Sequence, residues 1–209
     1  MAEVASTLDA APHEVPLFPL RSVLFPGAQL PLKVFEARYL DLIGRCMRER
    51  KGFGVVCLLL GADSGRGGVR FEREGVIAHI DDVDAEQAGI LQVRCTGRQR
   101  FAIAGEPRQQ GDGLWLADVT DQPDDEQLAP EAGLLPTVKA LANAIAALRA
   151  QGNVPFIEPY RFDEAGWVAN RWCEILPISL AAKQRLMMLT EPQLRLRLVD
   201  EYLRGKGVV

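Results

Sequence analysis

Short apolar runs separated by proline and glycine fill the chain from Glu14 to about residue 121. In order, the runs are VPLFPL, SVLFPG, LPLKVF, GFGVVCLLL, GVIAHI, GILQVRC, RFAIAG and LWLADV. Runs of this length with this punctuation predict short β-strands in a barrel or a sandwich. The prolines at positions 16, 19, 26 and 31 have no N–H to donate, so we expect the first strands to bend or to lie at an edge. The sequence thus predicts a curved, mostly antiparallel sheet.

One helix is predicted to interrupt these strands, over residues 36–50. Within FEARYLDLIGRCMRER, apolar side chains recur at i, i+3, i+4, i+7 and i+8, which is the spacing of one helical face. These positions are Tyr39, Leu42, Ile43, Cys46 and Met47. Gly52 follows them and is expected to end the helix.

A polar, acidic, proline-containing segment at 121–133, DQPDDEQLAPEAG, is typical of a boundary between domains. After it the apolar spacing becomes helical, and about four helices are predicted. The first is expected to end near Gly152. The others are expected to begin at the N-caps Asp163, Ser179 and Thr190, the last with Gln193 as its partner in a capping box.

The two patterns divide the chain into three predicted regions. Residues 1–13 are small and polar, and they predict a disordered tail. Residues 14–121 are predicted to form a strand-rich subdomain, and residues 122–209 a helical one. The predicted fold class is therefore α+β.

The formal net charge of −4 disfavours nucleic acid as a partner, because binding to phosphate backbones needs a basic face. The start of the chain, MAEVASTLDAAP, has neither a positively charged leader nor an apolar segment. The longest apolar run, at 55–60, is far too short to span a bilayer. We therefore expect a cytoplasmic protein that does not bind membranes.

The four cysteines, Cys46, Cys57, Cys95 and Cys173, form no CxxC pair, and three of them lie within apolar or periodic segments. This pattern is typical of small buried hydrophobic side chains, so reduced thiols are expected. The two histidines are far apart in the sequence, which disfavours a zinc cage or a Cys–His pair. Neither a metal nor a cofactor is predicted.

Three short motifs suggest chemistry, and a structural interpretation is favoured for each. The Gly-rich segment GADSGRGG at 61–68 lacks the Gly-Lys-Ser/Thr ending of a phosphate-binding loop and predicts a hairpin loop. Ser179 and Lys183 lie four residues apart on a predicted helix, so the amine could approach the hydroxyl as in a catalytic Ser–Lys dyad. A capping serine beside an exposed lysine is the more common arrangement and is favoured. The acidic run at 81–86 lacks the glycine and the final ligand of an EF-hand and predicts a solvated turn. No catalytic residue is predicted.

The stretch EVPLFPLRSVLFPGAQLPLKVFEARYLDLIGRCMRE at 14–49 resembles the start of the Lon protease N-terminal domain, a family that also includes cereblon. PLFPL, LFPG and LPLKVFEARY follow one another in the order of that family. GVIAHIDD, TGRQRFAI and LWLADV resemble its later strands, and LPISLAAKQRLMMLTEPQLRLRLVDEYL resembles its closing helices. The resemblance covers nearly the whole chain from Glu14, and we expect no Walker motif, peptidase domain or cereblon-type zinc domain.

The resemblance implies a PUA-like antiparallel β-barrel with one inserted helix, followed by a C-terminal helical bundle. In Lon, this region helps to recognise and hold unfolded or damaged polypeptides before they are threaded and cut. The implied function is that of a non-enzymatic module that binds unfolded or partly folded polypeptides. Such a module would act as an adaptor or holdase in protein quality control, with a protease or a chaperone as a further partner.

Two other functions stay open at the level of sequence. PUA-like barrels also occur in RNA-modifying proteins, but an RNA-binding protein needs a basic stripe with stacking aromatic residues. An enzyme of an unrecognised type would need a polar pocket with strongly shifted titratable groups. A map of the surface charge and the chemistry of the pockets distinguish these alternatives from polypeptide binding.

The polypeptide-binding residues are predicted to be Phe25, Tyr39, Phe156 and Trp167, as the walls of a groove between the barrel and the helices. Phe156 lies in the stretch PFIEPYRF, whose aromatic residues and prolines are too many for a plain solvent loop. Two alternatives are a barrel edge that accepts an extended peptide and a purely structural role in closing the core.

One ion pair is also predicted from the FEARY and GRQRF elements. We expect Glu36 to pair with Arg38 or Arg100, because charged groups near a core are retained when they are paired. The expected role of this pair is to fix the first helix.

Overall fold

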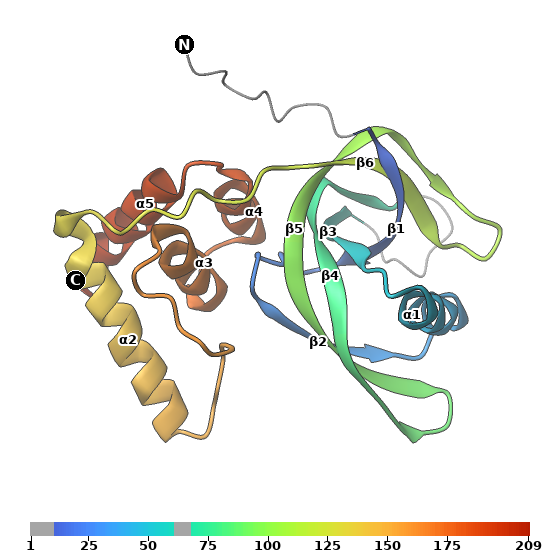
Figure 1. The fold of residues 1–209 in the computed structure, drawn as a ribbon, viewed down its shortest axis with the longest axis horizontal. Helices are drawn as coiled ribbons and strands as arrows, with labels where there is room; N and C mark the ends of the chain where they lie inside the picture. Colours follow the sequence, from blue (N-terminus) through green and yellow to red (C-terminus); the bar gives the residue numbers. More distant parts are fainter. Residues whose placement is uncertain (1–10, 61–67) are drawn as a thin grey trace, which may run out of the picture. The chain divides into compact units, whose positions relative to one another are not determined.

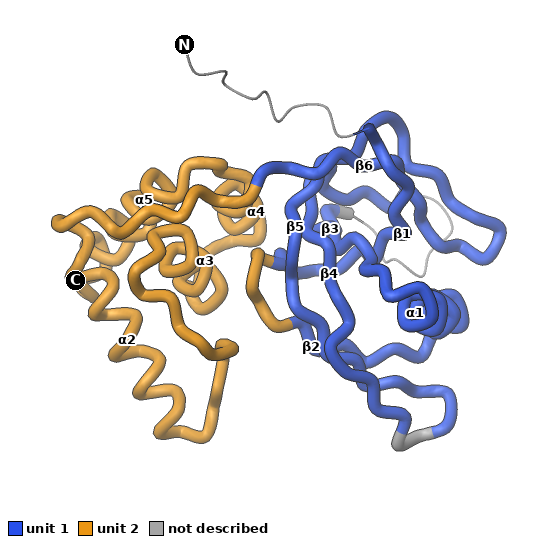
Figure 2. The backbone as a smooth tube through the Cα atoms, viewed as in Figure 1, with its two compact units in different colours: residues 1–24, 30–123 blue, residues 25–29, 124–209 orange. Residues whose placement is uncertain are grey.

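The computed structural model describes residues 11–60 and 68–209, which fall into two compact units (Figures 1 and 2). The β unit consists of the residues up to Leu24 together with Leu30–Pro123. The helical unit consists of Asp124–Val209 together with the short segment Phe25–Gln29, which interrupts the β unit in sequence. Nothing in the hydrophobic pattern singles out this segment.

Two sequence predictions concern residues that are mostly not described. Residues 1–10 of the predicted tail are outside the described part of the chain, whereas His13 already begins the first strand. The Gly-rich motif at 61–68 is outside it as well, except for its last residue.

In its described residues, the β unit contains six strands and one α-helix (Figure 1). Their bounds are β1 His13–Leu20, β2 Gln29–Val34, α1 Ala37–Glu49, β3 Phe53–Leu60, β4 Arg70–Gln87, β5 Ile90–Gln109 and β6 Trp115–Asp121. The strand order in the sheet is β2-β5-β4-β3-β1-β6, with a further pairing of β5 with β6. Five strands therefore form a closed circuit of pairings, to which β2 adds at β5.

Most of the pairings are antiparallel. The pairs β1–β6, β3–β4, β4–β5 and β5–β6 are antiparallel, whereas β1 and β3 are parallel, with Leu17 opposite Gly54. The parallel pair is possible because α1 lies between β2 and β3 in sequence and carries the chain back across the sheet. The predicted α+β class is confirmed.

The predicted short strands are wrong for β4 and β5, which have 18 and 20 residues. The acidic run at 81–86 was expected to be a turn, but it continues β4 because β5 places polar partners opposite it. Asp82 pairs with Arg94, and the hydroxyl of Thr96 donates to Asp81 at 2.6 Å. Register shifts along β4 and β5 mark bulges, which let such long strands bend.

The apolar core of the β unit depends on glycines that face an aromatic ring. Phe101 is completely buried, and a Cβ atom on Gly54 or Gly75 would lie 2.8 or 2.7 Å from its ring. At Gly75 the added atom would also lie 2.2 Å from the carbonyl oxygen of Val55. Close strand packing around this ring therefore requires glycine at both positions.

Helix α1 buries the predicted face except for its last member. Tyr39, Leu42, Ile43 and Cys46 are buried, whereas Met47 is exposed. The helix ends at Glu49 and not at Gly52, because Arg50 itself adopts the left-handed conformation, with φ 54°, and the N–H of Lys51 donates to Cys46.

The predicted strand SVLFPG is not a strand either. Its last residues form a turn in which the N–H of Ala28 donates to the carbonyl of Phe25 at 3.0 Å. Gly27 has φ +77°, a conformation that strands do not use and that glycine adopts without strain.

The helical unit contains a 3₁₀ turn and four α-helices, which agrees with the predicted number. Their bounds are η1 Ala132–Leu134, α2 Leu135–Ala150, α3 Ala165–Ile175, α4 Leu180–Met188 and α5 Pro192–Gly205. Helix α3 is the most buried of them and contacts α2, α4 and α5. Among the described residues, no helix is both long and apolar enough to cross a membrane.

One of the three predicted N-caps is confirmed. The hydroxyl of Ser179 accepts a hydrogen bond from the N–H of Ala182 at 3.2 Å. The N-cap of α3 is Glu164 and not Asp163, and the N-cap of α5 is Glu191 and not Thr190. The capping box fails because the amide of Gln193 donates to the carbonyl of Ala129.

Candidate functional site

The connector between α2 and α3, residues 151–164, carries a cluster of aromatic side chains. We define the aromatic cluster as Phe156, Tyr160 and Phe162 from this connector and Trp167 from the first turns of α3. The ring centroids of these three connector residues lie 6.4, 6.0 and 5.4 Å from that of Trp167. Edge-to-face geometry dominates the contacts, as is favourable for aromatic rings.

The cluster is open to solvent on one side. Phe156 is buried, but Tyr160, Phe162 and Trp167 are each only partly buried. The same connector exposes Val154 and Ile157, the second with 39% of its surface accessible. Exposed apolar side chains therefore lie beside the partly buried rings in this connector.

A buried guanidinium lies beneath the cluster. Arg171 of α3 is 1% exposed, and its guanidinium carbon lies 5.5 Å from the ring centroid of Phe156 and 5.7 Å from that of Trp167. It forms an ion pair with Glu174, one turn further along the helix. Such contacts between a cation and a ring face are attractive, and more so when they are shielded from water.

Burial shifts the pKa of both members of this ion pair. Burial lowers the pKa of Arg171, although the charge of Glu174 opposes that effect. Burial raises the pKa of Glu174 to about 7, although Arg171 opposes this change. The carboxyl of Glu174 is therefore poised to gain a proton near neutral pH.

A second arginine fastens the connector to α2. Nη1 of Arg149 donates to Glu158 at 2.9 Å, and its guanidinium carbon lies 6.0 Å from the ring of Tyr160. Both charged groups are exposed, so this pair contributes little to stability, but it restricts where the connector runs.

The four predicted polypeptide-binding residues occupy different places. Phe156 and Trp167 come together in the aromatic cluster, whereas Tyr39 lies in the β unit and stacks on Phe18 at 3.9 Å. Phe25 belongs to the helical unit and is completely buried. Tyr39 and Phe156 are each 3% exposed, so in the free chain only Trp167 of the four presents an accessible ring. Their role as the walls of a groove stays a prediction.

Sequence reasoning did not single out Tyr160, Phe162 or Arg171. The first two were visible as part of PFIEPYRF, the stretch that suggested Phe156. Arg171 gave no signal, because an arginine within a helical pattern is usually a solvated residue.

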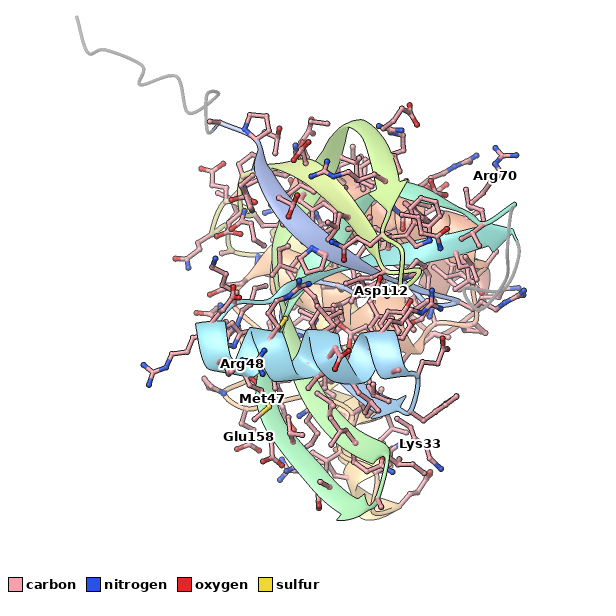
Figure 3. The ribbon with its side chains drawn as sticks, turned by 90° about the vertical axis from the view of Figure 1, so that its right-hand side faces the viewer. Lys33, Met47, Arg48, Arg70, Asp112 and Glu158 are labelled. Carbon is pink, nitrogen blue, oxygen red and sulfur yellow. The ribbon has the colours of Figure 1, made fainter. Side chains whose placement is uncertain are left out.

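The β unit has a hollow of about 270 Å³ beside α1. It is lined by Arg38, Leu40, Asp41, Leu42, Gly44, Arg45, Arg48, Asp112 and Leu114. In Figure 3, Arg48 and Met47 project from α1, and Asp112 lies beside the helix. Its charged lining consists of three guanidinium groups and two carboxylate groups.

Arg38 closes one side of this hollow and confirms the predicted ion pair. Its Nη2 donates to Glu36 at 2.8 Å, and its Nη1 donates to the carbonyl of Gly113 at 2.7 Å. Arg100 instead donates to the carbonyl of Pro123. The Glu36–Arg38 pair therefore ties the start of α1 to the loop that precedes β6.

The groups that suggested catalysis have structural partners. The hydroxyl of Ser179 caps α4, and Nζ of Lys183 donates to the carbonyl of Glu174 at 2.9 Å. All four cysteines are buried, and burial raises the pKa of each thiol, to about 12 for Cys173. A thiol with a raised pKa is a poor nucleophile. Within the described ranges, no group of three or more His, Cys, Asp or Glu side chains could hold a metal ion.

The proteins of known sequence to which this chain is similar include Lon proteases. Two of them, from Flavobacterium johnsoniae and Parabacteroides distasonis, are each 28% identical to the chain, over 186 and 184 residues. The matches cover 85% and 84% of this chain but 22% of each relative. The chain thus spans about a fifth of the length of these relatives.

The chain is also similar to solved structures of Lon N-terminal domains. A Lon N-terminal domain protein from Xanthomonas campestris is 33% identical, with a TM-score of 0.69 over 91% of this chain and 98% of that one. The N-terminal domain of a Mycobacterium avium complex Lon protease has a TM-score of 0.58 at 18% identity, over 91% and 97%, and shares the fold. Residues 14–205 match the family described as the ATP-dependent protease La (LON) substrate-binding domain. The chain therefore belongs to the Lon substrate-binding domain family, as the resemblance predicted.

Proposed function

We propose that this chain binds unfolded or partly folded polypeptides and releases them unchanged, as an adaptor or holdase of protein quality control in the cytoplasm. The observation that carries the proposal is the match of residues 14–205 to a family described as substrate-binding. A protease or a chaperone would receive the bound polypeptide. The proposed activity is binding alone, without chemical turnover.

The finer description of the fold is part of the proposal. The closed circuit of pairings among β1, β3, β4, β5 and β6 supports a PUA-like barrel. Four helices follow residue 134, and α2, α4 and α5 each contact α3, which supports a helical bundle.

The aromatic cluster is the proposed contact surface. Aromatic side chains bury a large apolar area and lose little conformational entropy, so they dominate binding surfaces. Trp167, Tyr160 and Phe162 contact one another, and Trp167 also packs against Arg171, which reduces the entropy lost on binding. A partner without fixed sequence needs such a surface, because apolar contact does not depend on hydrogen-bond geometry.

Short peptides should bind weakly to this surface. Ordering a flexible chain costs free energy that offsets much of the gain from apolar burial. An unfolded protein offers several apolar segments at once and should bind more tightly than any one of them.

The experiment is a titration of the chain with a reduced, carboxymethylated protein that stays unfolded, followed by fluorescence anisotropy. We expect Trp167→Ala to weaken binding about tenfold, the effect of losing a central aromatic contact. Ile157→Glu should weaken it severalfold, because it places a charge in the apolar surface without removing any core packing.

Leu198→Glu is the matched control. Leu198 of α5 is 41% exposed, close to the 39% of Ile157, and lies outside the connector. Its variant should bind like the native chain. Absence of binding by the native chain at high micromolar concentration would refute polypeptide binding, and equal affinities of all variants would refute this surface. A single-stranded RNA in the same assay should not bind.

A further inference from the structure

Arg171 connects the aromatic cluster to a distant segment of the chain. Besides its contacts with the rings and with Glu174, its Nη1 donates to the carbonyl of Gly27 and its Nη2 to the carbonyl of Pro26, both at 2.8 Å. These carbonyls are 144 and 145 residues away in sequence. One guanidinium is thus shared between Trp167 and segment 25–29.

Segment 25–29 is attached to α3 both by these hydrogen bonds and by apolar burial. Phe25 and Ala28 are buried within the helical unit, but the residues before and after the segment belong to the β unit. Hydrogen bonds from a charged donor are about twice as strong as neutral ones. The two bonds from Arg171 therefore strengthen the attachment of this turn to α3.

We propose that Arg171 is a positioning residue, through which polypeptide binding at the aromatic cluster and the attachment of segment 25–29 strengthen each other. The proposal rests on the proposed function. A polypeptide on Trp167 restricts that ring and the guanidinium packed against it, and the guanidinium in turn restricts the two carbonyls. Coupling of this kind is reciprocal, so loosening the segment must weaken binding by the same factor.

Gly27 offers a way to disturb the coupling without touching the cluster. A Cβ atom at this position would lie 3.0 Å from Nη1 of Arg171, and the backbone has φ +77°. Gly27→Ala should therefore displace the guanidinium from the carbonyls. Gly207→Ala is the matched control, because Gly207 has φ +68°, lies in the same unit and has no atom within 4 Å of its added Cβ.

The experiment has two readouts on the full chain, with the same carboxymethylated protein as the probe. The first is its affinity for each variant, after circular dichroism has confirmed folding. The second is hydrogen exchange of the backbone amides of residues 25–29 with and without the probe. Arg171→Lys provides a second variant, because lysine keeps the charge but lacks the planar fork that bonds two carbonyls.

We expect Gly27→Ala and Arg171→Lys to weaken binding about fivefold, the size of a modest coupling, and Gly207→Ala to leave it unchanged. In the native chain the probe should slow hydrogen exchange at residues 25–29. In Gly27→Ala and Arg171→Lys it should not. If Trp167→Ala weakens binding as expected while Gly27→Ala binds like the native chain and the probe does not change hydrogen exchange at residues 25–29, the coupling is refuted and the proposed function is not. If the native chain does not bind the probe, both are refuted.

Discussion

The two units of this protein are stabilised by different kinds of buried side chain. The β unit surrounds Phe101 with an apolar cluster made up of Val15, Leu17, Val56, Ile103, Ala117 and Val119. The helical unit buries polar and charged groups along with its apolar ones, namely Thr137, Asn170, Arg171, Gln184, Arg195 and Asp200. The β unit buries two such groups, Thr96 and Arg100. Its core is therefore specified mainly by volume, and that of the helical unit more by the directions of hydrogen bonds.

The polar groups of the helical unit hold segments that are not helical. Arg195 donates to Asp125 at 3.0 Å, to Asn170 at 2.9 Å and to the carbonyl of Leu186 at 2.9 Å. It thereby fixes the chain that enters the unit and the end of α4. Arg171 does the same for segment 25–29. Apolar packing alone could not satisfy the backbone carbonyls of such irregular segments.

The largest effect is expected from breaking this polar core. Arg195→Met should lower the free energy of unfolding by about 3–5 kcal/mol, because it leaves the partly buried carboxylate of Asp125 without its main partner. Urea denaturation followed by circular dichroism measures the loss. Arg108→Met in the β unit is the control, since the ion pairs of Arg108 with Glu14 and Asp118 are exposed and should contribute little. A similar loss for both arginines would contradict the comparison.

Conservative substitutions should distinguish the two cores more finely. Leu17→Met keeps the volume of a completely buried side chain in the β unit and should cost less than about 1.5 kcal/mol. Arg195→Lys keeps the charge, but it should cost more than Leu17→Met, because lysine cannot bond Asp125 in a bidentate manner. The midpoints of urea denaturation of the two variants test this order, and a reversed order would count against it.

The apolar pattern predicted the helices better than the strands. Period and length located α1 to α5, because each buried face repeats every three to four residues. β4 and β5 were predicted to be shorter than they are, because their polar ends are typical of loops. The pairing of Asp82 with Arg94 shows why the strands continue. Long-range partners of this kind cannot be seen from local sequence.

The candidate site was predictable only in part. The density of aromatic residues in PFIEPYRF indicated Phe156 and, with α3, Trp167, since such a stretch must cover something. The role of Arg171 could not be predicted, because its two carbonyl partners are more than 140 residues away in sequence. The N-cap of α5 was predicted wrongly for a similar reason, because Gln193 bonds to Ala129 across the unit instead of to its own helix end.

A smaller effect is expected from pH, and it should come from Glu174 in the helical unit. Burial raises the pKa of Glu174 to about 7, above the value of about 4.3 in an unfolded chain. The folded state binds this proton more tightly, so the contribution of Glu174 to stability falls as the pH rises from about 4.5 to about 7. Glu174→Gln removes the titrating group and should flatten the dependence between pH 5 and pH 8.

The measurement compares the free energies of unfolding of the native chain and of Glu174→Gln across this range. The contributions of the other titrating groups cancel in the difference, because both proteins contain them. The same slope in both proteins would show that Glu174 does not titrate there. If the native chain instead gains stability relative to Glu174→Gln as the pH rises, the pairing of Glu174 with Arg171 outweighs its burial.

Site-specific cross-linking tests the central claim most directly, namely that the aromatic cluster of the helical unit contacts polypeptides. A photoreactive phenylalanine analogue is placed at Ile157, beside the cluster, or at Leu198, which is equally exposed on α5. Each protein is irradiated with a fluorescent carboxymethylated polypeptide, and the cross-linked product is quantified after denaturing electrophoresis. We expect severalfold more product from position 157 than from position 198, and loss of that excess in the Trp167→Ala background. Equal yields at the two positions, or an excess unaffected by Trp167→Ala, would contradict the account.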